Sequence, residues 1–202
     1  MAHLSVTTAL PPPAPAPPRR RLRRLHLGCG NKYLEGFFHV DILDGPHIDY
    51  AGPVDDLPFI PNNTVELIYA CHVLEHFGRH EVRTALREWY RLLAPKGVLR
   101  LAVPNFAAVV AAYQEIGLED GQNGLMGLVC GGQRTPYDLH KVIFDEPYLT
   151  RLLQAVGFAA VRRWDWRTTD HSAVDDYSQA YLPHLDKTGG RLMSLNLEAE
   201  KR

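Results

Sequence analysis

The sequence predicts an α/β fold in which strands and helices alternate to build a doubly wound, mostly parallel sheet. Residues 65–70 form a nearly continuous apolar run of strand length, which is typical of a strand buried on both faces. Residues 79–93 place apolar side chains at helical spacing, and Pro95 and Gly97 end that pattern. Segments of these two kinds alternate along the chain, as they do in parallel sheets covered by helices.

The first part of the chain is expected to contain mainly strands joined by short connections. The interval between Gly30 and Phe37 leaves room only for a turn or a short helix at residues 32–35. Gly52 and Pro53 then interrupt the pattern. The strands predicted in this part span residues 24–27, 37–41, 48–51 and 65–70.

The second part predicts further helices, each followed by a strand. Residues 145–156 form the clearest of these helices, because Leu149, Leu152 and Leu153 share one face and Gly157 follows the last turn. Residues 192–199 alternate polar and apolar side chains, and we expect this final strand to return to an edge of the sheet. The other helices predicted here span residues 106–116 and 125–129, and the other strands span residues 98–103 and 158–163.

Composition and charge narrow the class of protein. The 202 residues are 46% hydrophobic and 22% charged, which is ordinary for one globular domain with its own core. A net charge of −1 provides no electrostatic attraction for nucleic acid or for a membrane surface. No apolar run approaches the ~18 residues that a membrane span needs. The three cysteines do not make a disulfide framework, so we expect a reducing, cytoplasmic environment.

We expect residues 1–23 to form a disordered tail ahead of a single domain at residues 24–202. Proline and alanine dominate the first 18 residues, a composition that does not pack into a core. Prolines interrupt the apolar stretch and the positive charges follow it, which is the reverse of a signal peptide. The arginine-rich run at residues 19–24 is either a solvated approach to the first strand or a contact for an anionic partner.

The first predicted strand ends in a glycine turn, and the second ends in a carboxylate. Gly28-Cys29-Gly30 follows residues 25–27, and glycines at this place let the backbone approach a ligand closely. Asp41 ends the second strand, where a carboxylate can accept both hydroxyls of a ribose. The two features together indicate a cofactor that contains a nucleoside. The third glycine of the dinucleotide fingerprint is missing, so a nicotinamide cofactor is the weaker choice.

These motifs, with three more blocks in the expected order, resemble the class I S-adenosylmethionine-dependent methyltransferases, in particular small members with a short first helix. The resemblance extends from residue 25 to about residue 161, and it includes the final strand. It implies a Rossmann-like sheet of seven strands, mostly parallel, with an antiparallel last strand. The blocks that carry it are residues 25–30, 40–42, 55–68, 73–76 and 92–99.

The resemblance implies S-adenosylmethionine as the cofactor and assigns residues to it. Backbone N–H groups of Gly28-Cys29-Gly30 would face the methionine carboxylate, since turn amides favour anions. Asp41 would accept hydrogen bonds from the ribose hydroxyls. The backbone at Cys71 and His72 would border the cofactor.

At the adenine end the sequence departs from the family pattern. Val54 and Leu57 would border the adenine ring. The family usually places an aspartate nearby to bind the adenine amino group, but here that position is Pro53. Either Asp55 or Asp56 substitutes for it, or the backbone alone holds the adenine.

The resemblance also implies transfer of a methyl group, and we expect the acceptor to be an oxygen or nitrogen atom of a small molecule. A sugar, a glycan precursor or a secondary metabolite would fit, because no basic face or recognition domain is predicted. Such an enzyme must align the nucleophile and exclude water, and a histidine base helps when the nucleophile is a hydroxyl. The candidate bases are His140 and His171. The candidate acceptor-binding residues are Tyr137, His140 and Lys141.

Two other functions remain open at this point. His72, Glu75 and His76 fit the His-x-x-Glu-His pattern of inverted zinc peptidases, in which both histidines hold zinc and the glutamate is the base. This segment directly follows a predicted strand, so it begins in a turn, and no later glutamate stands out as a third ligand. The preferred interpretation therefore has no metal ligands. The second alternative is a non-catalytic protein that binds a partner through the same fold.

Overall fold

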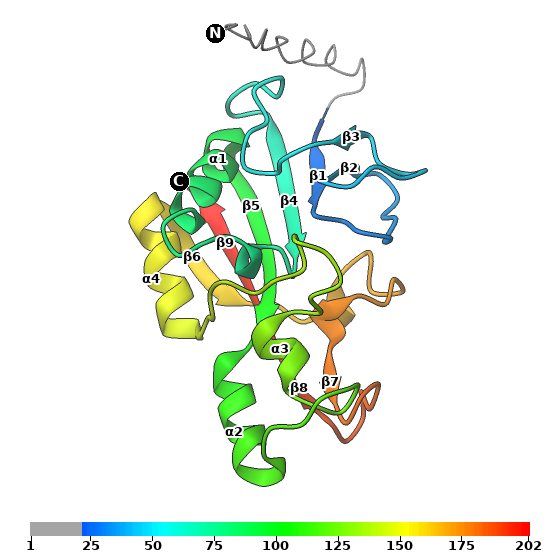
Figure 1. Cartoon of the computed structure of the whole chain (residues 1–202). Coiled ribbons are helices and arrows are strands. Elements are labelled where there is room, and N and C mark those ends of the chain that lie inside the picture. Colours follow the sequence, from blue (N-terminus) through cyan, green and yellow to red (C-terminus); the bar gives the residue numbers. More distant parts are fainter. Residues whose placement is uncertain (1–21) are drawn as a thin grey trace, which may run out of the picture.

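The computed structural model describes residues 22–202, and its centre is a seven-stranded sheet in the order β3-β2-β1-β4-β5-β9-β6 (Figure 1). All neighbouring strands pair in parallel except β9, which is antiparallel to both β5 and β6. The predicted fold class, including the antiparallel last strand, is confirmed. The strands are β1 (Arg24–Leu27), β2 (Phe38–Asp41), β3 (Tyr50–Ala51), β4 (Val65–Cys71), β5 (Leu93–Pro104), β6 (Phe158–Arg163) and β9 (Ser194–Lys201).

The expected place of the last strand at an edge of the sheet is wrong, because β9 lies between β5 and β6. Its register pairs Leu101 of β5 with Leu197, and Phe158 of β6 with Lys201. Leu197 belongs to the main core, while Asn196 on the opposite face is also buried and donates to the Ser178 carbonyl at 2.9 Å. The alternating pattern therefore arises from one apolar and one polar face, both of them covered.

Helices α1 (Val82–Leu92) and α4 (Glu146–Val156) lie side by side on one face of the sheet (Figure 1). Their apolar faces join the main core, where Trp89, Leu149 and Leu153 are fully buried. Helices α2 (Phe106–Ile116) and α3 (Met126–Cys130) lie beyond the end of β5 instead (Figure 1). These four helices match the predicted ones within a few residues.

Irregular segments cover part of the opposite face of the sheet. Leu34 and Phe37 pack there against Tyr69 of β4, and Trp164 and Val174 complete the cluster. Residues 32–34 are irregular and residue 35 begins a turn, so no short helix forms there. Two 3₁₀ turns and a two-stranded ribbon follow β6, and the ribbon strands are β7 (Tyr181–Leu182) and β8 (Arg191–Leu192).

The expected disorder of the tail concerns mostly residues 1–21, which lie outside the described residues. Leu22, at the end of the expected tail, packs against the main core. Arg23 forms an ion pair with Glu66 at 2.8 Å and accepts a backbone hydrogen bond from it. Across residues 22–202, every helix is too short or too polar to cross a membrane.

Candidate active site

A cavity of about 710 Å³ opens at the carboxyl ends of β1, β2 and β4. Ligand sites in α/β sheets lie at this end of the strands, and small-molecule pockets measure roughly 300–1,000 Å³. One wall comes from the strand ends and the loop after β3, and the other comes from the segment after α3. The lining residues are Gly28, Gly30, Asp41, Ile42, Leu43, Pro53, Val54, Asp55, His72, Val73, His76, Phe77, Glu81, Arg134, Thr135, Pro136, Tyr137, Asp138 and Lys141.

The glycine turn after β1 has a conformation that other residues rarely adopt. Gly28 and Gly30 have φ angles of +60° and +54°. A Cβ atom on Gly28 would lie 2.5 Å from a methyl carbon of Val73. The N–H of Gly28 donates to the Val40 carbonyl at 2.8 Å. Contrary to the expectation, this N–H is therefore not free to bind the methionine carboxylate. The turn therefore presents glycine Cα surface to the cavity, which allows a ligand to approach closely.

Asp41 forms the neighbouring part of this wall. Its Oδ2 accepts the N–H of Gly30 at 2.8 Å, and its Oδ1 accepts the N–H of Leu43 at 2.9 Å. These two bonds fix the orientation of the carboxylate. A carboxylate has about four acceptor sites, so each oxygen retains one for a pair of hydroxyl groups.

The structure brings six of the ten predicted cofactor residues to the cavity, and it places four elsewhere. Gly28, Gly30, Asp41, Val54, Asp55 and His72 line it. Of the others, Cys29 is buried, and burial raises the pKa of its thiol to about 12. Leu57 is fully buried in the core, and Asp56 is exposed. Burial also raises the pKa of the Cys71 thiol well above its usual value.

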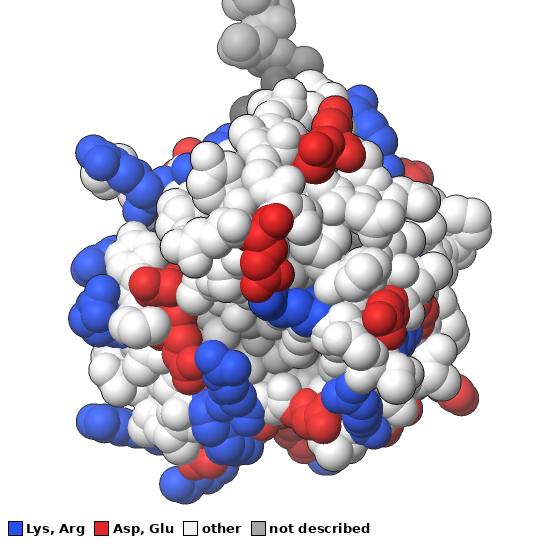
Figure 2. Space-filling view, turned by 90° about the horizontal axis from the view of Figure 1, so that it is seen from below, with Lys and Arg blue, Asp and Glu red and all other residues white. Residues whose placement is uncertain are grey.

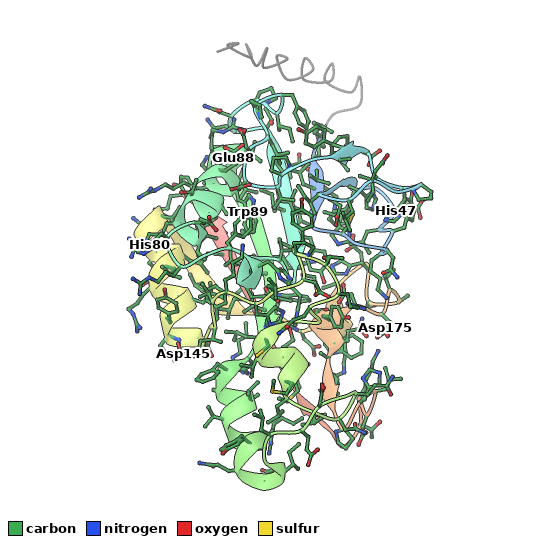
Figure 3. All side chains as sticks on the ribbon, viewed as in Figure 1. His47, His80, Glu88, Trp89, Asp145 and Asp175 are labelled. Atoms are coloured by element: carbon green, nitrogen blue, oxygen red, sulfur yellow. The ribbon has the colours of Figure 1, made fainter. Side chains whose placement is uncertain are left out.

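Helix α1 holds the loop that contains Val54 and Asp55. The indole N–H of Trp89 donates to the Val54 carbonyl at 2.8 Å, and Glu88 accepts the N–H of Leu57 at 2.9 Å. Both side chains extend from α1 (Figure 3). Pro53 and Asp55 line the cavity, and Asp56 does not, so Asp55 is the aspartate that remains a candidate for the adenine end beside the backbone.

The second wall was largely missed by the sequence analysis. Tyr137 and Lys141 were predicted and line the cavity, but Arg134, Thr135, Pro136 and Asp138 were not considered. Arg134 donates to Asp138 at 2.9 Å, which closes a short turn. Gly131-Gly132 before this segment was the available signal, because paired glycines mark a change in chain direction.

A buried carboxylate with three histidines around it lies where the two walls meet. Glu75 is fully buried, and across residues 22–202 neither oxygen of its carboxylate has a hydrogen-bond partner of good geometry. Its Oε1 lies 3.2 Å from Nδ1 of His72 and 3.9 Å from Nε2 of His140. The ring of His76 lies 5.0 Å from that of His140. We call these four residues the Glu75 cluster.

Burial sets the protonation of the Glu75 cluster. It raises the pKa of Glu75 to about 8 and lowers the pKa of His72 to about 3, because the interior disfavours both charged forms. Burial lowers the pKa of His140 too. His72 also has a φ of +54°, which a residue with a side chain adopts only under constraint.

The two predicted bases occupy different parts of the molecule. His140 belongs to the Glu75 cluster. His171 is packed against Phe37, Tyr69 and Trp164, and its Nε2 lies 3.2 Å from Arg100. It does not line the cavity, because its segment covers the opposite side of β4.

Comparison with solved structures gives the fold. A S-adenosylmethionine-dependent methyltransferase from Mesorhizobium loti has a TM-score of 0.55 and 21% identity, over 89% of this chain and 91% of that chain. The 1,6-didemethyltoxoflavin N1-methyltransferase of Burkholderia thailandensis, solved with 1,6-didemethyltoxoflavin and S-adenosylhomocysteine, has a TM-score of 0.53 and 17% identity. That alignment covers 90% of this chain and 72% of that chain. A search of curated proteins found no match.

A family model described as a methyltransferase domain matches residues 40–101. This stretch contains Asp41, the loop after β3 and three members of the Glu75 cluster. The chain therefore has the fold of the S-adenosylmethionine-dependent methyltransferases, and residues 40–101 match their domain model. The cavity fits S-adenosylmethionine as a cofactor. One wall carries, in order, a turn without side chains, a carboxylate with free acceptor sites, and the apolar pair Pro53 and Val54. S-adenosylmethionine, when bound, supplies an electrophilic methyl group on a sulfonium.

Proposed function

We propose that this methyltransferase methylates an oxygen or nitrogen atom of a small molecule. The observation that carries the proposal is a cavity with two chemically different walls. The wall of Gly28, Gly30 and Asp41 suits a nucleoside cofactor, and the wall of Tyr137 and Lys141 offers an aromatic ring and a cation to a polar acceptor. A small molecule enclosed between them is aligned and shielded from water, which is most of what methyl transfer requires.

The surface supports a small acceptor over a nucleic acid. On the face in Figure 2, positive and negative side chains are interspersed, and uncharged residues cover much of the remaining area. Binding to a phosphate backbone usually depends on clustered Lys and Arg side chains. The toxoflavin methyltransferase similar in fold was solved with a small-molecule ligand, which agrees with this proposal.

In this proposal the Glu75 cluster receives or orients the acceptor. His72 and His76 line the cavity, and His140 contacts both Glu75 and His76. His140 therefore remains in the proposal as a residue that activates the acceptor. His171 is no longer part of it, since it lies on the other side of β4.

Calorimetry with S-adenosylhomocysteine tests the cofactor half of the proposal. We expect one equivalent to bind, and Asp41→Ala to weaken binding at least about tenfold because two hydrogen bonds to a charged acceptor are lost. The matched control is Asp56→Ala, an exposed carboxylate outside the cavity, which leaves the affinity unchanged. Equal affinity of Asp41→Ala and the unaltered protein would contradict the assignment.

The acceptor half is tested with radiolabelled S-adenosylmethionine and a cell extract separated by size. We expect the label in the small-molecule fraction, and in an acid-stable ether or amine. Label incorporated only into protein or nucleic acid would overturn the proposed acceptor class while leaving the cofactor result standing.

A further inference from the structure

The Glu75 cluster contains three ligand atoms that face one another. One carboxylate oxygen of Glu75 and one ring nitrogen from each of His76 and His140 all lie within 4.8 Å of one another. They come from two distant segments, the 3₁₀ turn Leu74–His76 and the segment after α3. A backbone hydrogen bond joins these segments, from the N–H of Lys141 to the Glu75 carbonyl at 2.8 Å. The fold itself therefore holds the three ligand atoms together.

Both histidines are oriented by backbone carbonyls. Nδ1 of His76 lies 3.0 Å from the Leu139 carbonyl, and Nδ1 of His140 lies 3.0 Å from the Leu128 carbonyl. A carbonyl only accepts, so each Nδ1 carries the proton and each Nε2 keeps a free lone pair. Histidine ligands of metals show this arrangement, in which the second nitrogen donates to an oxygen and fixes the tautomer.

His72 provides a further lone pair next to Glu75. Asn196 donates to the Ser178 carbonyl, so its Oδ1 accepts the hydroxyl of Ser194 at 2.8 Å. Ser194 then accepts from Nε2 of His72 at 3.3 Å, which leaves Nδ1 of His72 without a proton. This nitrogen lies 3.2 Å from Glu75 Oε1, so two acceptors face each other. Such a contact is satisfied either by a proton on Glu75, whose O–H then donates to Nδ1, or by a cation beside the two atoms.

From this geometry we infer that Glu75, His76 and His140 bind a divalent transition-metal ion at the acceptor end of the cavity. Two imidazoles and one carboxylate form the ligand set of many catalytic zinc sites, with ligand distances of about 2.0–2.2 Å. Rotations of the side chains close the remaining separation. His72 lies beside this set and is not one of the three ligands.

The inferred ion deepens the proposed function and rests on it for its role. Three protein ligands leave at least one position of a tetrahedral ion free. His76 lines the cavity, so that position is available to an oxygen or nitrogen atom of the acceptor. A cation there lowers the pKa of an acceptor hydroxyl, whose proton passes to solvent, and the oxygen is then the better nucleophile.

The test titrates the full chain with Co²⁺ and with Zn²⁺ after treatment with a chelator. Co²⁺ reports its coordination through visible absorption, and Zn²⁺ is followed by competition with a chromophoric chelator. We expect one equivalent of each metal and a Co²⁺ spectrum typical of four or five ligands. We expect His140→Ala and Glu75→Gln each to weaken binding by about 100-fold or more, since each removes one of three ligands. The control His80→Ala, an exposed histidine at the outer side of the molecule (Figure 3), leaves binding unchanged.

Several outcomes overturn the inference. These are no bound metal, binding of several weak equivalents, or tight binding that persists in both ligand variants. Glu75→Gln preserves the shape of the side chain, and circular dichroism of each variant shows whether it folds. Calorimetry with S-adenosylhomocysteine is performed on the metal-free protein, so loss of metal binding and loss of cofactor binding are recorded separately.

Discussion

The N–H of Lys141 donates to the carbonyl of Glu75 at 2.8 Å, which joins the segment after α3 to the end of β4. This bond belongs to the backbone, and the Lys141 side chain is exposed at the cavity. The position of His140 therefore depends on the backbone of its neighbour and not on the lysine side chain.

Lys141→Ala is accordingly expected to change the free energy of unfolding by no more than about 0.5 kcal/mol, as for other surface positions. Urea unfolding measures this. S-adenosylhomocysteine affinity should also be unchanged, because Lys141 is on the opposite wall. A loss of more than about 1 kcal/mol in the free energy of unfolding would show that the lysine side chain helps to hold the two segments together.

Gly28→Ala should destabilise the protein by about 1–3 kcal/mol, through both overpacking and the positive φ angle. The added Cβ would lie 2.5 Å from the Val73 methyl. Gly30→Ala is the matched variant, because its φ is similar but a Cβ there meets nothing within 4 Å among the described residues. It should lose less stability, and its added methyl group should weaken S-adenosylhomocysteine binding. If both variants lost the same free energy of unfolding in urea, the clash with Val73 would not be the cause of the destabilisation.

Trp89→Phe removes the indole N–H that binds the Val54 carbonyl. We expect a cost of about 1–3 kcal/mol, since a buried carbonyl loses its partner, together with weaker S-adenosylhomocysteine binding as the loop loosens. Trp164→Phe is the control, because its indole donates to the Leu101 carbonyl at 2.9 Å from the other face of the sheet. It should lose stability while keeping its affinity. Unchanged affinity in Trp89→Phe would show that the cofactor does not depend on this loop.

His26 should make the protein less stable as the pH falls below about 6.5. Burial lowers its pKa from 6.5 to about 3, and His39, His47 and His171 oppose its charged form too. Tyr69 stacks on the ring at 5.3 Å. Between pH 6.5 and 3 the unfolded chain binds a proton at His26 that the folded protein excludes, so stability is present above this range and declines by up to about 1.4 kcal/mol per pH unit within it.

The contribution of His26 is isolated by comparison with His26→Phe. Unfolding in urea from pH 7 to pH 4.5 should give a shallower loss of stability in the variant than in the unaltered protein. Parallel curves would mean that His26 accepts a proton in the folded state. The comparison is needed because the lowered pKa values of His39 and His171 act in the same direction.

The sequence predicted the sheet because each buried strand is a short apolar run, and the runs alternate with helical spacing. It did not predict the position of β9, since a buried polar face has the same alternation as an exposed one. Ser194 and Asn196 are buried because the segment around Ser178 covers them, and that segment has no regular pattern of its own.

For the candidate site, too, the sequence predicted the local features and not the contacts between distant segments. Gly28, Gly30 and Asp41 are local signals at strand ends, so the sequence located them. The meeting of Glu75 with His140 depends on a return of the chain across many residues, and neither histidine spacing nor composition records it. Leu57 was placed at the adenine for its position in the motif, but its burial in the core removes it from the cavity.

Because β9 lies between β5 and β6, the sheet cannot be completed in the order in which its strands are synthesised. β6 precedes β9 in the sequence, yet within the described sheet its only strand partner is β9. Until β9 is synthesised, β6 therefore has no strand partner and β5 has one unpaired edge. An unpaired strand edge is the part of a folding chain most open to association with other molecules. The period of risk for this protein lies between the synthesis of β6 and that of β9, and it concerns the side of the sheet opposite β1, β2 and β3.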